Sequence, residues 1–160
     1  GARRLPDECV RRLREADLIL HAGDFVALSV LEELRGLGPV EAVCGNVDEL
    51  SLRRELPEER VVEAGGARIG MVHDAGPAAG RELRLAARFA GCDAIVYGHT
   101  HLANVSRVPV PAAVRGGAVE GAVWTLNPGS PTERRRAPSR TMLVLEIGGG
   151  TIAPQLVTLS

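Results

Sequence analysis

Four short apolar stretches of the sequence each end in side chains that can bind a metal ion. The endings are His-Ala-Gly-Asp at 21–24, Gly-Asn-Val-Asp at 45–48, His-Asp at 73–74 and Gly-His-Thr-His at 98–101. Carboxylate, amide and imidazole groups form a mixed oxygen and nitrogen set, which suits Mn²⁺, Fe or Zn²⁺ better than Ca²⁺. A shared metal site is the chemistry that these residue types indicate.

The apolar stretches are typical of buried strands, because they are short and bounded by turn residues. The expected strands cover 17–22, 40–44, 67–73 and 94–97. Ligands of α/β proteins bind in the crevice outside the carboxyl ends of the strands. The four endings are therefore expected to meet at one edge of the fold.

Taken singly, each ending has an ordinary structural explanation. The Gly-Asp pair at 23–24 is typical of a turn, and the Gly-Asn pair at 45–46 is typical of a left-handed turn. His73 alone is compatible with a buried, hydrogen-bonded histidine. The Gly-His-Thr-His stretch at 98–101 is more specific, because two imidazoles two residues apart can reach one cluster from a loop. The order and spacing of all four endings together favour a functional site.

The rest of the chain predicts the elements that hold these endings. Apolar residues at helical spacing predict helices over 5–16, 27–34 and 83–90, and Gly65-Gly66 predicts a two-residue hairpin turn. After residue 102 the pattern is of strands alone, over 103–108, 118–126, 141–147 and 151–157. This order favours an α/β fold with two packed sheets over a single doubly wound sheet.

The composition is ordinary for a soluble globular domain. The chain has 160 residues, of which 45% are hydrophobic and 24% charged, and its net charge is -1. That balance gives no strong nucleic-acid signature, and no apolar run reaches the ~20 residues of a membrane-spanning helix. The three cysteines lack CxxC spacing, and no leader opens the chain, so we expect a cytoplasmic protein with reduced thiols.

The motifs resemble those of the calcineurin-like metallophosphoesterase superfamily, and in particular its small bacterial and archaeal phosphodiesterase branch, the YfcE type. The matching stretches are 18–24, 43–48, 72–73, 97–101 and 126–132, in the order of the family. The resemblance implies a single domain over 1–160. It also implies an αββα sandwich of two mixed β-sheets flanked by helices, with a two-metal site along one edge.

The resemblance also implies a role for each ligand. Asp24 would bridge two divalent ions, Asn46, His73 and His99 would complete the shell of one ion, and His101 would bind the other. The catalytic group would be Asp24, Asn46 and His99. Mn²⁺ is the expected metal, with Zn²⁺, Fe and Ni²⁺ as alternatives. A hydroxide held between the two ions would then attack phosphorus.

Two features depart from the family pattern. The family opens with a strand ending in Asp-x-His, which supplies the rest of the second metal's shell, and no match to it precedes Asp24. We therefore expect the domain over 1–160 to lack its first strand and to hold only one fully liganded metal. An upstream strand ending in Asp-x-His in the natural protein is the favoured explanation, and a real departure from the family is the alternative. Val47 stands where many members carry the histidine that protonates the leaving group. Asp48 could be that acid, although a turn-closing hydrogen bond is the favoured role.

Three further candidates have two interpretations each. Arg136, in the arginine run 134–136, could contact the substrate phosphate beside Asn46, but a solvated loop or a subunit contact is favoured. Trp124 is expected in the core. Cys44 is expected to be a small buried hydrophobe and not a ligand, because it lies inside a strand.

The predicted function is metal-dependent hydrolysis of a small-molecule phosphate ester, most readily a phosphodiester. Two alternatives stay open. One is a non-enzymatic scaffold with a degenerate metal site, like the retromer subunit of the superfamily. The other is a phosphomonoesterase or nucleotidase. No membrane association is expected, and a homodimer or tetramer is the expected assembly if the chain associates.

Overall fold

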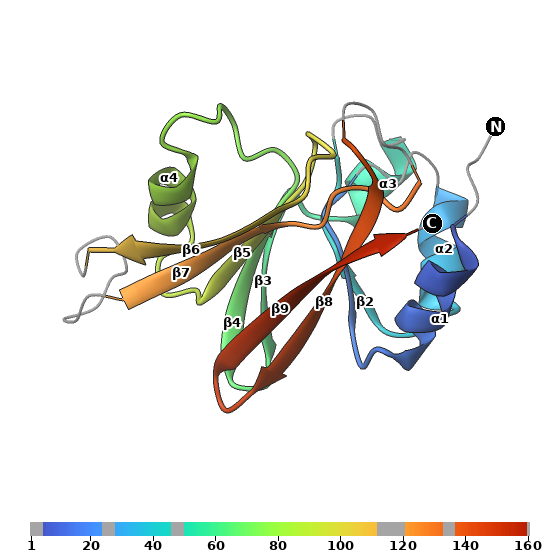
Figure 1. Ribbon diagram of the computed structural model, residues 1–160. Helices are drawn as coiled ribbons and strands as arrows, with labels where there is room; N and C mark the ends of the chain where they lie inside the picture. The colour runs from blue at the N-terminus through green and yellow to red at the C-terminus, as the bar shows by residue number, and fades with distance from the viewer. Residues whose placement is uncertain (1–4, 24–27, 46–49, 112–120, 133–136, 160) are drawn as a thin grey trace.

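The computed structural model describes residues 5–23, 28–45, 50–111, 121–132 and 137–159. Its helices are α1 (Asp7–Glu15), α2 (Leu28–Arg35), α3 (Leu50–Glu55) and α4 (Arg81–Arg88). Its strands are β1 (Ile19–His21), β2 (Val40–Ala42), β3 (Glu59–Ala64), β4 (Ala67–Val72), β5 (Ala94–Tyr97), β6 (Asn104–Val110), β7 (Gly121–Asn127), β8 (Arg140–Gly148) and β9 (Thr151–Leu159). Figure 1 shows how these elements are arranged.

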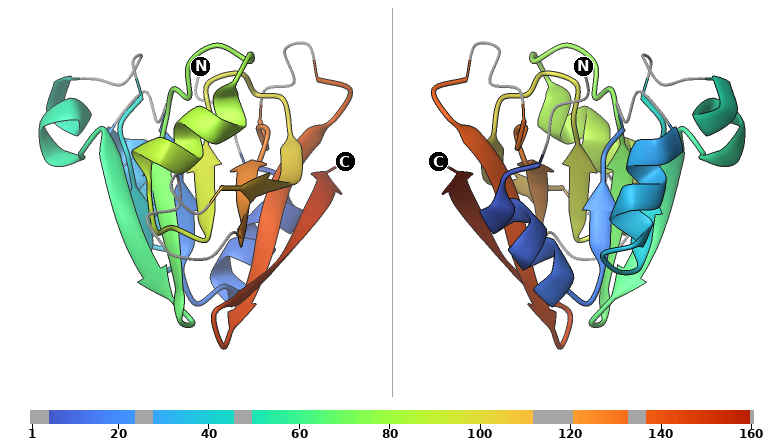
Figure 2. Two further views of the ribbon diagram at one scale, coloured as in Figure 1. Left: turned by 90° about the vertical axis from the view of Figure 1, so that its left-hand side faces the viewer. Right: turned by 90° about the vertical axis from the view of Figure 1, so that its right-hand side faces the viewer.

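The elements form four layers. A mixed five-stranded sheet has the order β3-β4-β5-β7-β6, and its neighbouring layer consists of the parallel pair β1-β2 and the antiparallel hairpin β8-β9. Helix α4 lies on one outer face, and α1 and α2 lie on the opposite outer face (Figure 2). The predicted α/β sandwich is therefore confirmed, with its second β-layer divided into two hydrogen-bonded pairs.

Apolar side chains fill the space between each pair of layers. The core between the two β-layers includes Ile69, Met71 and Leu126 of the large sheet, and Leu143 and Leu145 of β8 pack against it. A second core lies between the large sheet and α4, a third joins α2 and α3 to β2, and a fourth joins α1 to β8-β9. These contacts fix the positions of the strand ends that carry the candidate ligands.

The predicted hairpin is confirmed, with Ala64 opposite Ala67 and positive φ angles of 56° and 82° at Gly65 and Gly66. Helix α3 is an element that the sequence did not predict. It has only six residues, too few for a helical repeat to stand out, and it is held by the burial of Leu52 against α2.

Within the described part of the chain, no helix is long and apolar enough to cross a membrane.

Candidate metal centre

The carboxyl ends of three strands from both β-layers meet at one point. Gly23 follows β1 with a φ of 102°, and a Cβ atom built on it would lie 2.8 Å from the Gly45 nitrogen after β2 and 2.9 Å from His73 Nδ1 after β4. Any side chain here would collide, so glycine is required for the strand ends to approach. The ends of β1, β2 and β4 therefore meet as predicted, at Gly23, Gly45 and His73.

His73 is the best-defined residue of the centre. It is only 5% exposed, and its Nδ1 lies 2.7 Å from the carbonyl oxygen of Ala22. Because a carbonyl can only accept, Nδ1 must carry the proton, and the neutral ring has its lone pair on Nε2. A backbone carbonyl that fixes the tautomer in this way is typical of metal-ligating histidines.

The loop after β5 brings a second imidazole to His73. The ring centroids of His73 and His99 lie 5.3 Å apart in an edge-to-face arrangement. The Gly98 amide donates to the His73 carbonyl at 3.0 Å, which ties the start of the loop to the end of β4. Two imidazoles at a strand-end junction fit a divalent ion of the transition series.

His99 and His101 both adopt the left-handed conformation, with φ angles of 72° and 60°. The Thr100 amide donates to the Gly98 carbonyl at 2.9 Å, which closes a γ-turn around His99. A γ-turn with positive φ at its central residue is rare and strained. The two histidines are thus held in a conformation that an unconstrained loop would not favour.

The other predicted site residues lie outside the described residues. These are Asp24, Asn46 and Arg136, together with Val47 and Asp48. Within the described ranges, no group of three or more His, Cys, Asp or Glu side chains could hold a metal ion. The structure therefore brings His73 and His99 together, and the roles of the remaining ligands stay predictions.

Sequence reasoning assigned no role to Asn127, which lies at the end of β7 and is 0% exposed. Its Nδ2 donates to Thr100 Oγ1 at 3.1 Å and to the Gly98 carbonyl at 3.4 Å. The sequence does show a polar residue at the end of an apolar strand, beside a Pro-Gly turn. The pattern alone does not show which groups its side chain hydrogen-bonds.

Two secondary predictions can be compared with the structure. Cys44 is buried among Leu31, Leu34 and Leu52, as expected for a small hydrophobe. Trp124 is only partly buried, because it packs against the core on one side while the guanidinium of Arg107 lies 5.4 Å from its ring.

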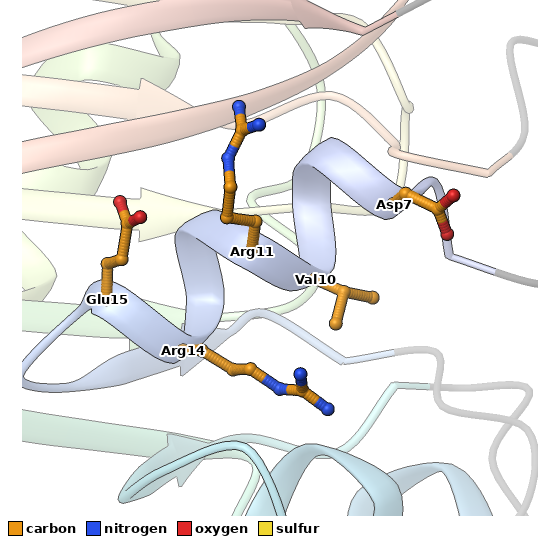
Figure 3. Close-up of a pocket in the computed structure, with 5 residues that line it drawn as sticks. All are labelled: Asp7, Val10, Arg11, Arg14 and Glu15. Carbon is orange, nitrogen blue, oxygen red and sulfur yellow. The ribbon is translucent and has the colours of Figure 1, made fainter.

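A surface hollow lies away from these strand ends, along α1. Figure 3 shows that its lining side chains all come from this one helix, with Arg11 and Arg14 pointing to different sides. Because no second element contributes a lining residue, this hollow lacks the converging polar groups of an active site.

The fold and the strand-end histidines define the class as an α/β protein that brings imidazoles together at the carboxyl ends of its strands. Residues 1–150 match the calcineurin-like phosphoesterase superfamily domain. The chain belongs to this superfamily, and the predicted family is confirmed.

Individual relatives agree with this assignment. The chain is 33% identical to a probable metallophosphoesterase of Methanothermobacter thermautotrophicus over 158 residues, which is 98% of this chain and 84% of the relative. A solution structure of a Thermotoga maritima protein is similar with a TM-score of 0.69 and 32% identity, covering 97% of this chain and 88% of the other. A mutant of Vps29 from Entamoeba histolytica is similar with a TM-score of 0.71 and 25% identity, and the match covers 100% of this chain and 93% of the other.

Proposed function

We propose that this chain hydrolyses phosphodiesters of small molecules at a divalent-metal centre built from Asp24, Asn46, His73, His99 and His101. The observation that carries the proposal is the junction at His73. There the Ala22 carbonyl lies 2.7 Å from His73 Nδ1 and fixes the tautomer of the ring, and the His99 imidazole lies beside it. Gly23, which has no side chain, allows the neighbouring strand end to approach.

The chain's own residues prepare this centre. The Ala22 carbonyl holds the His73 ring in one orientation and keeps the proton on Nδ1, so that Nε2 is ready to bind a cation. His99 approaches from a loop that is tied to the end of β4. In the proposal Asp24 would hold both ions, Asn46 would bind one ion and the substrate phosphate, and Arg136 would contact the phosphate. Mn²⁺ is the proposed ion.

When bound, divalent ions supply positive charge for the phosphoryl oxygens and make a water molecule acidic enough to react near neutral pH. Val47 cannot protonate the leaving group, because a valine side chain has no acidic proton. This difference favours esters whose leaving group is already a weak base. Aryl phosphodiesters are therefore the substrates for which we expect the highest rates.

A further strand completes the second metal shell in this proposal. Among the described residues, β1 is hydrogen-bonded to a strand only on the side of β2, and β8 only on the side of β9. A strand that pairs along either remaining edge and ends in Asp-x-His would supply the ligands that accompany His101.

Hydrolysis of bis-p-nitrophenyl phosphate with added Mn²⁺ tests the proposed activity. We expect hydrolysis that EDTA abolishes. Faster release from the monoester p-nitrophenyl phosphate would instead assign the chain as a phosphomonoesterase or nucleotidase.

A second candidate function is protein assembly, favoured by the likeness to Vps29. The name of that protein describes vacuolar protein sorting, a role in which the fold need not perform catalysis. A folded, metal-bound chain with no turnover of either ester would favour this candidate.

A further inference from the structure

The loop that carries His99 and His101 needs an external constraint. Both histidines have positive φ, at 72° and 60°, a region that non-glycine residues occupy uncommonly. Such conformations persist only where the surrounding structure determines them. Hydrogen bonds to Thr100, the residue between the two histidines, hold the loop in this conformation.

Thr100 is bonded on two sides. Its Oγ1 accepts from the buried Asn127 Nδ2 at 3.1 Å and from the Leu102 amide at 3.2 Å. The same Nδ2 group lies 3.4 Å from the Gly98 carbonyl, at the other end of the turn. One amide group of β7 therefore contacts the turn on both sides of His99.

Asn127 is itself held from behind by the loop that follows β7. Its Oδ1 accepts from the Gly129 amide at 3.0 Å, and Thr141 Oγ1 of β8 donates to the Pro128 carbonyl at 2.8 Å. A Cβ atom on Gly129 would lie 2.0 Å from Thr141 Oγ1, so this loop and β8 are in close contact. The Asn127 side chain is accordingly held by the Gly129 amide, and the loop that carries this amide is hydrogen-bonded to β8.

We propose that Asn127 and Thr100 are positioning residues that hold His99 and His101 in their metal-binding conformation. The inference rests on the proposed function, because it takes these histidines as ligands. Neither residue touches substrate or metal in this scheme. They act through the backbone of the turn between the two histidines.

The chain offers a matched set of variants. Thr100→Val removes the hydroxyl that accepts from Asn127, and Thr100→Ser restores it. Thr125→Val is the control. Thr125 lies on the same strand as Asn127 and is 1% exposed, and its hydroxyl has no hydrogen-bond partner among the described residues.

Two readouts separate positioning from general stability. The first is the Mn²⁺ dissociation constant by calorimetry. The second is the amide–Hα nuclear Overhauser effect within His99 and within His101 in the metal-free chain, which is strong when φ is positive. Thermal unfolding monitored by circular dichroism confirms that each variant is folded.

We expect Thr100→Val to weaken Mn²⁺ binding by about 10- to 100-fold, the range for residues that orient metal ligands, and to reduce both Overhauser effects. Thr100→Ser and Thr125→Val should resemble the parent chain. Unchanged affinity and unchanged Overhauser effects in Thr100→Val would overturn the inference. If the parent chain binds no Mn²⁺, the proposed function fails, and the Overhauser effects still decide whether Thr100 positions the turn.

Discussion

At the scale of single residues, hydrogen bonds from neighbouring groups set the orientation of the candidate ligands. The Ala22 carbonyl fixes the proton on one nitrogen of His73, and the hydrogen bonds of Asn127 reach the turn that contains His99. The candidate ligands that the sequence indicates are thus oriented by Ala22 and Asn127, to which the sequence pattern assigns no role. Two predictions belong to this scale.

Asp24→Asn tests the carboxylate that is proposed to bridge the metals. The substitution removes a negative charge without a change of size, so we expect Mn²⁺-dependent hydrolysis to fall by on the order of 10²-fold or more, as for loss of a major electrostatic element. Rates on bis-p-nitrophenyl phosphate, with circular dichroism to confirm folding, provide the measurement. A rate close to that of the parent chain would show that Asp24 is not the bridge.

Cys9 gives the chain a pH dependence of stability. Burial, with a smaller contribution from the charge of Glu8, raises the pKa of this thiol from its ordinary 9.0 to about 11. Above pH 9 the unfolded chain loses the thiol proton while the folded chain keeps it. The free energy of unfolding should therefore fall by roughly 2 kcal/mol as pH rises from 9 to 11.

Urea unfolding at pH 8.5 and pH 11 measures this effect, with Cys9→Ala as the comparison. The parent chain should lose more stability than the variant between the two pH values, because other titrating groups are common to both. Equal losses in both chains would show that Cys9 does not titrate as its burial requires.

At the scale of elements, the site depends on how closely strand ends can approach. The segments after β1 and β2 lie so close together that a Cβ atom on Gly23 would overlap the backbone of Gly45. The same region joins the large sheet to the smaller β-layer through the contact of His73 with Ala22. Strand packing therefore sets the geometry of the candidate ligands.

Gly23→Ala tests this approach, with Gly80→Ala as its control. Both glycines have positive φ, but an added Cβ meets nothing within 4 Å at Gly80. Gly80→Ala should cost about 1 kcal/mol for its conformation alone. Gly23→Ala should lower the free energy of unfolding by at least about 2 kcal/mol, because its Cβ would also overlap the backbone of Gly45. It should also weaken Mn²⁺ binding. Equal costs in urea unfolding would contradict the close approach.

The elements also show what the sequence could and could not predict. The strands that end at His21 and Tyr97 were predictable, because their apolar runs stop at turn and ligand residues. The γ-turn at His99 was not, because its conformation depends on hydrogen bonds from Asn127, which lies 28 positions along the chain. Helix α3 was missed because its short sequence has too few turns to show a repeat.

At the scale of the whole molecule, two β-layers form the edge that carries the proposed metal centre. The large sheet supplies His73 and the loop of His99, while the smaller layer supplies Ala22 and Gly23. In the proposal, Asp24 and Asn46 complete one metal position, and His101 alone accompanies Asp24 at the other. Two protein ligands are fewer than the three or four that usually hold such an ion.

The metal content of the folded chain tests this account most directly. Elemental analysis after incubation with Mn²⁺ and removal of unbound metal is performed on the parent chain and on His73→Gln, with circular dichroism to confirm folding. The account predicts about one tightly held ion per chain in the parent, since only one position has the usual three or four ligands, and loss of that ion in the variant. No bound metal in the parent, or full retention of the ion in folded His73→Gln, would contradict it.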